Sequence, residues 1–525
     1  MTKVCGASPG LLVFAVALLG ACPPADGDSP SSSSDTQSTS DTPTTSSTSS
    51  TSSADTSDAA SETVGIQPFC GDGVLGADED CDDGNISDAD SCLANCTPAA
   101  CGDAHLWIGT EECDEGDNND AKSFTGCRPQ CTLAACGDGA LYPITLGPRI
   151  TLAAGVGNDS AKISKTSPRA VAIDKSGQVY AITDWSLSGG TKHQVVLERF
   201  SADGILVKTT VIAEGIFPIE HPSIAVTAGG ALITLWQQNT QNESNVYYRR
   251  YDPMGAPIEA ATDILENSLG NQHSPMVASN NAGDFVVTFR AIGGPDLLDH
   301  HIIRARKIPA RGPAKADFIV SSLSVDISAP TASIRDDGSF IVGYSDRDLG
   351  LIYIHEYSSE GILKSILDPV TNLHAAATTE SRPWIGAAAL EDGGIAVAGI
   401  TDADTIGVRR YGADGSVIFE EAASNTPYSS IPRIELIADA AANLVVLWGA
   451  CGLDREGSKC SNSDAELAFR RIYADGELFG NTTILDTSIT WKPQGVGIAT
   501  NALGDLAIVA EDTDPFLWIA RANCP

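Results

Sequence analysis

The chain has 525 residues, enough for more than one domain, and it carries 68 acidic against 32 basic residues, a formal net charge of −36. This charge argues against nucleic acid or an anionic membrane surface as a partner, because both recruit clustered Lys and Arg. Such acidity is typical of a protein that must stay soluble outside the cell.

The first 21 residues have the features of an export signal. Lys3 precedes an apolar run over residues 11–19 that is too short to cross a bilayer as a mature helix. The run ends in Leu-Gly-Ala-Cys22, which resembles a bacterial lipobox; an ordinary signal peptide with a chance cysteine is the alternative. The resemblance implies lipidation of Cys22. Because Pro23 stands where the inner-membrane retention signal has Asp, it also implies the outer membrane or the cell surface.

Residues 22–66 form the next segment. From residue 27 onward they are Ser, Thr and Asp with almost nothing apolar, so they cannot bury enough surface to fold. A flexible chain of this length spans roughly 35 Å on average. The segment is therefore predicted to be a disordered tether that lifts the folded parts off a membrane.

Residues 67–139 contain two four-cysteine units and the start of a third. The first unit opens with Cys70-Gly-Asp-Gly and continues with Glu-Asp-Cys81-Asp-Asp-Gly-Asn; the second keeps Cys101-Gly-Asp and Glu-Glu-Cys113-Asp-Glu-Gly. The pattern resembles the myxococcal cysteine-rich repeat, which also occurs in pappalysin-like secreted proteins. The second unit departs from it, because Phe-Thr-Gly precedes Cys127 where the acidic triplet should stand. Modules this small have little core and depend on disulfides.

The candidate metals for this region are zinc and calcium. Zinc needs paired CxxC-type spacing, which the cysteines do not supply. Calcium takes oxygen ligands, and the first unit holds a run of candidates for it; solvent-facing turn residues are the alternative. The candidate calcium ligands are Asp82, Asp83, Asn85, Asp88 and Asp90.

Twelve cysteines remain after the signal and the lipidated residue are set aside. Eight of them pair within the two units in an order that the sequence leaves open, and Cys451 and Cys460 lie in one loop as natural partners. Cys136 and Cys524 are then left over together. The predicted disulfide cysteines are Cys70, Cys81, Cys92, Cys96, Cys101, Cys113, Cys127, Cys131, Cys136, Cys451, Cys460 and Cys524.

A longer repeat fills residues 145–525. Seven copies open with a proline followed by a short strand of small residues, at gaps of 54, 53, 55, 53, 49 and 61 residues. Repeats of about this length with four short strands are typical of propeller blades. The sequence therefore predicts an all-β fold, a seven-bladed β-propeller, preceded by the disulfide-rich module and the tether. The opening prolines are Pro168, Pro222, Pro275, Pro330, Pro383, Pro432 and Pro493.

A second series of residues runs in phase with the prolines. Its first six members are each followed, five or six residues later, by a glycine, as tight hairpin turns with positive φ require. The last copy supplies only three strands, so we expect residues 150–154 to add the outer one and close the ring without exposed edges. The series is Arg199, Arg250, Arg306, Glu356, Arg410, Arg471 and Arg521.

The two faces of the predicted propeller differ in their loops. If the strands of a blade are called A to D, the A–B and C–D turns are short and alike, whereas the B–C and D–A loops are long and variable. Function concentrates on variable loops, so we expect binding on the long-loop face. Blade-to-blade packing is the alternative for the tryptophans. The candidate binding residues are Arg169, Trp185, Trp236, Trp384 and Arg433.

The sequence has no HExxH, GxSxG, Walker A or Rossmann motif. We therefore predict a lipid-anchored cell-surface protein, not an enzyme, whose propeller binds an extracellular protein or a glycan. A propeller enzyme, such as a polysaccharide lyase or hydrolase, and a structural envelope protein without a specific ligand are the alternatives.

Strand alternation places Cys524 on the short-turn face, beside the start of the closing strand. Cys136 lies 13 residues before Arg149 and is close enough along the chain to reach it. We expect a Cys136–Cys524 disulfide that locks the ring and fixes the cysteine-rich stalk to the short-turn face. In the chain-entropy model so long a loop is worth roughly 4 to 5 kcal/mol.

Overall fold

The computed structural model describes residues 69–525 except 153–161, 164–169, 266–270, 293–299, 311–312, 322–326, 347–348, 368–369, 371–372, 374–384, 453–464, 487–495 and 512–514. Within these residues the fold is all-β, and its helical elements are two 3₁₀ turns, Gly116–Asn118 and Ser188–Gly190. None of the helices in this part of the chain is long and apolar enough to span a membrane.

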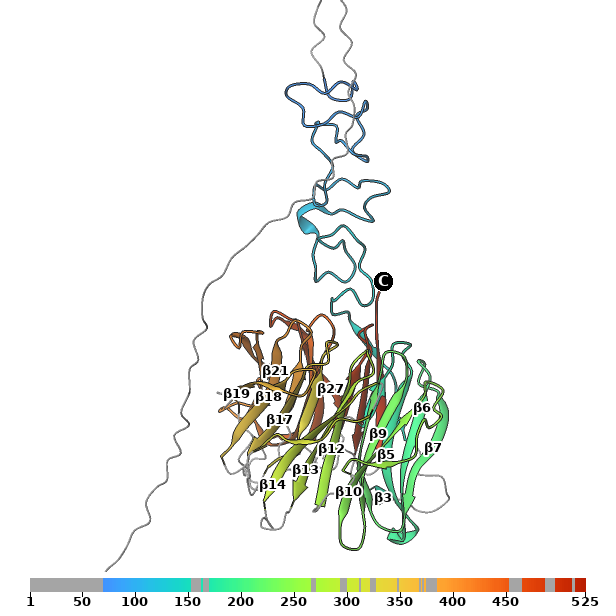
Figure 1. Cartoon of the computed structure of the whole chain (residues 1–525). Helices are drawn as coiled ribbons and strands as arrows, with labels where there is room; N and C mark the ends of the chain where they lie inside the picture. Colours follow the sequence, from blue (N-terminus) through green and yellow to red (C-terminus); the bar gives the residue numbers. More distant parts are fainter. Residues whose placement is uncertain are drawn as a thin grey trace, which may run out of the picture. The chain divides into compact units, whose positions relative to one another are not determined.

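The described strands form seven antiparallel sheets whose inner strands contact one another in a closed circle, which confirms the seven-bladed propeller (Figure 1). Blade one contains β3 (Lys162–Ile163), β4 (Val171–Ile173), β5 (Val179–Leu187), β6 (Lys192–Phe200) and β7 (Leu206–Gly215). Blade two contains β8 (Ile219–Val226), β9 (Leu232–Asn239), β10 (Ser244–Tyr251) and β11 (Thr262–Asp263). Blade three contains β12 (Asn271–Ser279), β13 (Phe285–Ile292), β14 (His301–Ile308) and β15 (Phe318–Ile319).

The remaining blades follow the same order from the axis outward. Blade four contains β16 (Thr331–Ile334), β17 (Phe340–Asp346), β18 (Leu351–Tyr357) and β19 (Leu363–Leu367). Blade five contains β20 (Gly386–Ala389), β21 (Ile395–Ile400), β22 (Ile406–Tyr411) and β23 (Val417–Ser424). Blade six contains β24 (Tyr428–Ala438), β25 (Leu444–Gly452), β26 (Ala465–Ile472) and β27 (Leu478–Asp486). Blade seven contains β28 (Val496–Thr500), β29 (Leu506–Glu511), β30 (Pro515–Ala522), β1 (Ile144–Leu146) and β2 (Ile150–Thr151).

Both ends of the propeller chain build blade seven. The expected outer strand is present at β2, which pairs with Leu517 and Phe516, but β1 extends it toward the N-terminus and pairs with residues 520–522 of β30. The two pieces are separated at Pro148, which has no N–H to give to the ladder, although Gly147 still donates to the carbonyl of Ile519. The closing strand therefore begins six residues earlier than the predicted strand at residues 150–154.

Some members of the in-phase series tie neighbouring blades together. Arg410 donates to the carbonyl of Ala474 in the next blade's C–D turn, and Arg521 donates to that of Ala202 in blade one. The strand register corrects one member of the series. Arg410 stands one residue before Tyr411, which pairs with Ile395 at the start of β21. In blade three, Ile308 pairs with Phe285 at the start of β13, so the equivalent residue is Lys307 and not Arg306. Lys307 accordingly reaches the carbonyl of Ser359 in the next blade at 2.9 Å.

The core lies between the blades. Small residues on the inner strands, such as Ala172, Ala225 and Ala278, are buried close to the axis, and large side chains fill the space farther out. Burying apolar surface of this extent is the dominant driving force for folding. Trp185, Trp236 and Trp448 are among the largest fully buried side chains.

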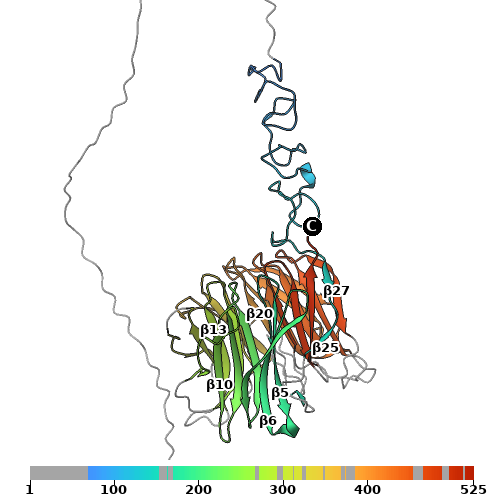
Figure 2. The same cartoon turned by 90° about the vertical axis from the view of Figure 1, so that its right-hand side faces the viewer.

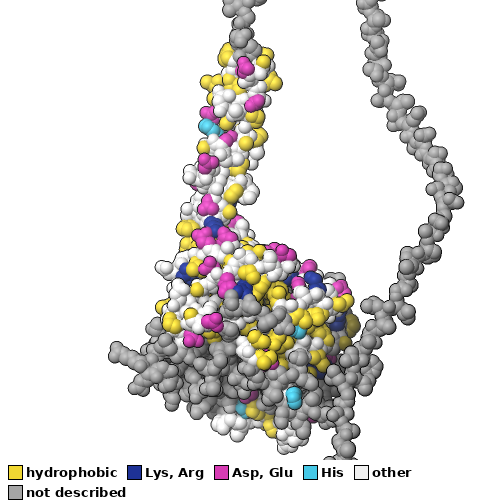
Figure 3. All heavy atoms as spheres, turned by 90° about the vertical axis from the view of Figure 1, so that its left-hand side faces the viewer, with side chains coloured by type: hydrophobic (Ala, Val, Ile, Leu, Met, Phe, Trp, Pro, Cys, Tyr) yellow, Lys and Arg dark blue, Asp and Glu magenta, His cyan; other side chains and the backbone are white. Residues whose placement is uncertain are grey.

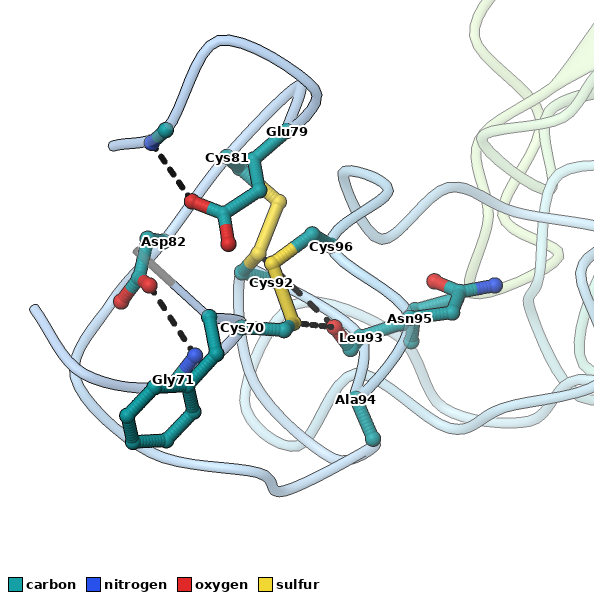
Figure 4. The surroundings of a disulfide bond; sticks show 12 residues. Cys70, Gly71, Glu79, Cys81, Asp82, Cys92, Leu93, Ala94, Asn95 and Cys96 are labelled. Carbon is teal, nitrogen blue, oxygen red and sulfur yellow. Dashed lines mark hydrogen bonds between the residues drawn. A yellow bond between two sulfur atoms is a disulfide. The ribbon is translucent and has the colours of Figure 1, made fainter. Parts of the chain in front are cut away.

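The cysteine-rich region, here called the stalk (residues 69–143), consists of two units with the same nested disulfide order. Cysteine one pairs with four and cysteine two with three: Cys70–Cys96, Cys81–Cys92, Cys101–Cys131 and Cys113–Cys127. Figure 4 shows the first unit, in which the two disulfides lie side by side. The stalk has few regular strands or helices, so these bonds and short turns hold it together.

The stalk joins the propeller on the face of the A–B and C–D turns (Figures 1 and 2). The structure pairs Cys136 with Cys524, the two cysteines that counting left over. Lys122 forms ion pairs with Asp475 and Glu477 in the C–D turn of blade six, and their proximity raises the pKa of Lys122. Asn443 donates to the carbonyl of Gly139 at 2.7 Å, so several independent contacts fix the junction.

Candidate functional site

A cavity of about 350 Å³ lies on the propeller axis. All seven inner strands line it, from β4 round to β28, together with the A–B turns that follow them. Its walls are mostly small or apolar because the inner strands crowd together at the axis. The polar groups gather at the rim, on the same face as the stalk.

In blades one and six the first residue of the A–B turn is an aspartate that holds the turn. The carboxylate of Asp174 accepts the amides of Ser176 and Gln178, and Asp439 accepts those of Ala441 and Asn443. These are Asx turns, in which a short acidic side chain replaces a backbone acceptor. Asp174 and Asp439 therefore build the rim, and their oxygens are already engaged.

The second residue of each turn lines the cavity mouth and differs from blade to blade. Blades three, four and five place the polar residues Asn281, Asp336 and Glu391 there. The amide and side-chain nitrogen of Asn281 donate to the two oxygens of Asp336 at 2.9 and 2.7 Å. The amide of Asp336 then donates to both oxygens of Glu391 at 3.1 and 3.2 Å.

These three residues form a continuous arc, here called the acidic arc (Asn281, Asp336 and Glu391). Partial desolvation raises the pKa of Glu391, and the carboxylates of Asp336 and Asp337 raise it further, against the opposing effects of the Asp336 amide and Arg335. The carboxylates of Asp336 and Glu391 lie at the mouth of the axial cavity, whose walls are largely apolar. The arc can accept hydrogen bonds from hydroxyl groups or pair with a cation.

The opposite side of the mouth belongs to the stalk. Blades six and seven place the small residues Ala440 and Ala502 at the second turn position, and the stalk base lies beside them, with Gly137 against Ala502 and Gly139 against Ala441. A side chain at Gly137 would meet the carbonyl oxygen of Ala502 at 2.9 Å, so this contact requires glycine. Figure 3 shows acidic side chains spread along the stalk, with basic side chains near its base.

The predicted binding residues that the structure describes are not accessible. Trp185 and Trp236 are each 1% exposed, and the indole nitrogen of Trp185 donates to the hydroxyl of Thr183 at 2.8 Å. Arg433 is 3% exposed on β24. Burial argues against direct ligand contact by these three residues: Trp236 packs in the core cluster shared with blade one, and Trp185 packs on Leu187 and Val196 of its own blade. Arg169 and Trp384 lie outside the described residues.

The calcium candidates separate into two groups. Both oxygens of Asp82 accept backbone amides, among them that of Gly71 (Figure 4) and those of Gly73 and Gly84. Asp88 accepts the amide of Ala94. Burial acts to raise the pKa of Asp82, but the amide hydrogen bonds outweigh it and lower that pKa. Asp82 and Asp88 are therefore turn-holding residues rather than free ligands.

Asp83 and Asn85 also hold the turn, since Asp83 accepts the amide and side-chain nitrogen of Asn85 and Asn85 accepts the amide of Ser87, but both lie beside the fifth candidate, Asp90. Asp83 and Asn85 both contact the carboxyl of Asp90; burial acts to raise the pKa of Asp90, but these contacts lower it. One oxygen of Asp90, Oδ1, is shielded from solvent and has no hydrogen-bond partner among the described residues. A carboxylate oxygen in this state fits a site that can accept a cation.

Some predicted sites lie beyond the described residues. These are the lipidation site Cys22, the tether, Cys460 and the side chain of Cys451. The residues of the acidic arc, in contrast, lie in the described part of the chain. They were not predicted, because the A–B turns are short and similar in sequence. A signal was present: Asn281, Asp336 and Glu391 recur at intervals of 55 residues, in phase with the opening prolines.

Fold and stalk together define a class: a seven-bladed β-propeller with an N-terminal disulfide-rich region. No family model matches the chain. A stretch of 48 residues, 9% of the chain, is 52% identical to the acetylcholinesterase collagenic tail peptide of Torpedo marmorata and covers 10% of that protein. The chain thus spans about one tenth of the length of this relative.

Solved structures share the fold at low identity. The WD40 domain of Toxoplasma gondii coronin is 10% identical, with a TM-score of 0.41 over 73% of this chain and 89% of that one. The polysaccharide lyase Uly1 is also 10% identical, with a TM-score of 0.41 over 72% of this chain and all of that one. The acylaminoacyl peptidase of Pyrococcus horikoshii is 13% identical, with a TM-score of 0.42 over 68% and 51%. These likenesses extend to the fold alone.

Proposed function

We propose that the protein is a lipid-anchored surface protein whose propeller recognises a glycan in the axial cavity. The observation that carries this is the acidic arc at the mouth of a cavity of about 350 Å³. Planar amide and carboxylate groups suit the hydroxyl groups of a sugar, and the apolar inner strands suit its C–H faces. This places recognition on the stalk side of the ring, opposite to the face that the loop lengths favoured.

The surface location rests on chemistry of another kind. Five disulfides in the described residues require an oxidising compartment, so the protein is extracytoplasmic. The lipobox-like Cys22 and the likeness to myxococcal cysteine-rich repeats support export to a bacterial envelope. In this proposal the tether and the stalk hold the propeller away from the membrane.

A glycan array followed by calorimetry tests the proposal. Asp336→Asn with Glu391→Gln keeps the size of both side chains but removes their charge. We expect at least about a tenfold loss of affinity, since charge-assisted hydrogen bonds contribute about 1.5–3 kcal/mol each. Glu243→Gln, on the exposed B–C loop of blade two, is the matched control and should bind as the native protein does.

Other results would redirect the assignment. Binding of a basic peptide but no glycan, lost in the same double variant, would make the cavity a protein-recognition site. Release of shortened sugars from a bound polysaccharide would favour the propeller enzyme, with the two carboxylates as acid and base. Full binding by the double variant would remove the acidic arc from recognition and contradict the proposal.

We also propose that the first stalk unit binds Ca²⁺ through a ligand set smaller than the sequence predicted. The shielded Oδ1 of Asp90, beside Asp83 and Asn85, favours it. Calorimetric titration of the whole protein with Ca²⁺ should show one site that Asp83→Asn with Asp90→Asn abolishes and Asp88→Asn retains. A native titration without heat, or one unaffected by the double change, would reject calcium.

A further inference from the structure

The stalk ends in the beginning of a third repeat, Cys136-Gly137-Asp138-Gly139. Its turn has the geometry of the first two repeats. In each repeat the aspartate that follows Cys-Gly accepts the amide three residues before it and the amide two residues after it. These aspartates are Asp72, which accepts Phe69 and Val74; Asp103, which accepts Ala100 and His105; and Asp138, which accepts Ala135 and Ala140.

The propeller supplies what the third repeat lacks. In a complete repeat the first cysteine pairs with the fourth, whereas Cys136 pairs with Cys524, 388 residues away. Gly71 in the first repeat lies against the carbonyl of Asn85, and Gly137 lies in the same way against the carbonyl of Ala502 in blade seven. The third repeat is thus completed by the end of the chain.

The Cys136–Cys524 disulfide also connects two strands that no C–D turn joins. In six blades a short C–D turn joins strands C and D, but in blade seven these strands, β30 and β1, come from opposite ends of the propeller chain. The amide of Asn523 donates to the carbonyl of Pro143 at 2.7 Å, and the Cys136–Cys524 bond closes the connection. Without the disulfide, β1 keeps its three residue pairs with β30 and the backbone hydrogen bonds of Pro143 and Gly147, but no covalent link joins it to β30.

This disulfide differs from the four repeat disulfides in its exposure. Each of those has one buried cysteine, namely Cys96, Cys92, Cys131 or Cys127, all 4% exposed or less. Their partners are accessible, and Cys101 is exposed, but attack on such a partner would expel a buried thiolate. In the fifth bond neither cysteine is buried: Cys136 is exposed and Cys524 is half-buried. Exchange requires an accessible sulfur and a leaving thiolate that is not disfavoured by burial, and the fifth bond meets both conditions.

We propose that Cys136–Cys524 is a thiol–disulfide exchange site and that its reduction unlocks the ring at blade seven. A dithiol reductant supplies the electrons. Its first thiolate attacks the sulfur of the more exposed Cys136, and Cys524 leaves as a thiolate that takes up a proton. The second thiol of the reductant then displaces Cys136, which is also protonated, and the reductant becomes a disulfide. Two electrons and two protons pass to the Cys136–Cys524 disulfide, here called the clasp.

Differential alkylation of the whole native protein tests the exchange. Aliquots taken during incubation with a thioredoxin-type dithiol are blocked with one iodoacetamide isotope, then denatured, reduced and labelled with the other. We expect Cys136 and Cys524 to be released at least about tenfold faster than the eight repeat cysteines, since access and the burial of the leaving thiolate limit the rate. Equal or faster release of a repeat pair would overturn the assignment.

Proteolysis tests the unlocking. Arg149 lies between β1 and β2, so trypsin cuts after it once the closing strand detaches. We expect the double variant Cys136→Ser with Cys524→Ser to be cut there at least about tenfold faster than the native protein, in proportion to the open population. Cys81→Ser with Cys92→Ser, which breaks a disulfide of the first stalk unit and leaves the Lys122 contacts with blade six in place, is the control and should leave this rate unchanged. Equal rates in the clasp variant and the native protein would show that the bond does not govern closure.

Discussion

Arg471 on β26 donates a hydrogen bond of 2.6 Å to the backbone carbonyl of Tyr142, which lies 329 residues earlier in the chain. Arg410 and Arg521 make the corresponding bond to a residue in the next blade's C–D turn. Blade seven has no such turn, yet Tyr142, just before β1, takes its place. The clamp between neighbouring blades is therefore kept where the ring closes, between two segments that no turn connects.

Replacing Arg471 should loosen this closure. Arg471 is 9% exposed, and Arg471→Met keeps its bulk but leaves the Tyr142 carbonyl without its donor. We expect the free energy of unfolding to fall by roughly 1–3 kcal/mol, the cost of an unsatisfied buried acceptor. Urea denaturation measures the change. Arg250→Met is the comparison: its partly exposed ion pair with Glu259 stays within one blade and should cost about 1 kcal/mol or less.

A loss for Arg471→Met no larger than that for Arg250→Met would contradict this account. It would show that the junction does not need the guanidinium. The apolar packing of blade seven would then carry the closure alone.

Periodicity made the ring predictable. The prolines and basic residues recur once per blade, so seven copies implied seven sheets, and short glycine-containing turns implied hairpins; Gly204 and Gly255 do adopt a φ of 78°. The exact member of each series was harder to choose. Arg306 and Lys307 are adjacent, and only the strand register shows that Lys307 occupies the clamp position.

The candidate site was less predictable, because the type of a residue does not show whether its side chain is buried or exposed. Trp236 ends a B strand near long loops, but its side chain turns between blades, where its indole nitrogen contacts Gln238. Asp82 has the composition of a calcium ligand, but its oxygens are taken by backbone amides from ten or so residues earlier in the chain. Backbone amides and a metal ion compete for the same carboxylate oxygens. Which of them is close enough depends on how the chain folds back on itself, and residue spacing does not show that.

Blade three should make the protein sensitive to mild acid. Burial, together with Arg290 and His301, lowers the pKa of His273 from 6.5 to about 4. Above pH 6.5 the side chain is neutral in both states and has no effect. Between 6.5 and 4 the unfolded state takes up the proton first, so stability falls as the pH falls, by at most about 3 kcal/mol and by less where solvent reaches the ring.

His273→Gln removes this titration. We expect the difference in unfolding free energy between pH 7 and pH 4.5 to be smaller in this variant than in the native protein, as measured by denaturant titration at both values. His105→Gln, at an exposed position in the stalk, should behave as the native protein does. An identical pH dependence in all three would rule out His273 as the source.

Membrane attachment should depend on a single residue. Cys22→Ser removes the thiol that lipid transfer requires, and a lipid chain is what holds such a protein to the bilayer. We expect the variant in the soluble fraction after cell lysis, while Cys5→Ser, within the signal, stays with the membranes. Membrane attachment of both variants would mean that another part of the chain provides the anchor.

The base of the stalk should weaken in strong acid. Burial acts to raise the pKa of Asp138, but the amides of Ala135 and Ala140, the hydroxyl of Tyr142 and the guanidinium of Arg128 outweigh it, so this pKa is lowered from 3.8. A lowered carboxyl pKa contributes stability that is complete above 3.8 and is lost as the pH falls through the lower folded value. Arg128, 5% exposed, would then be left beside a neutral partner.

Asp138→Asn reproduces that neutral state at every pH. At pH 7 we expect it to lower the free energy of unfolding by roughly 3 kcal/mol, since removing one partner strands a buried charge. As the pH falls below 3.8 and through the lower folded value, the native protein loses the same interaction, so the two stabilities should converge. Asp203→Asn, in an exposed C–D turn, should match the native protein over the whole range. A difference between Asp138→Asn and the native protein that stays constant as the pH falls from 7 through this range would show that the carboxylate charge does not stabilise the base of the stalk.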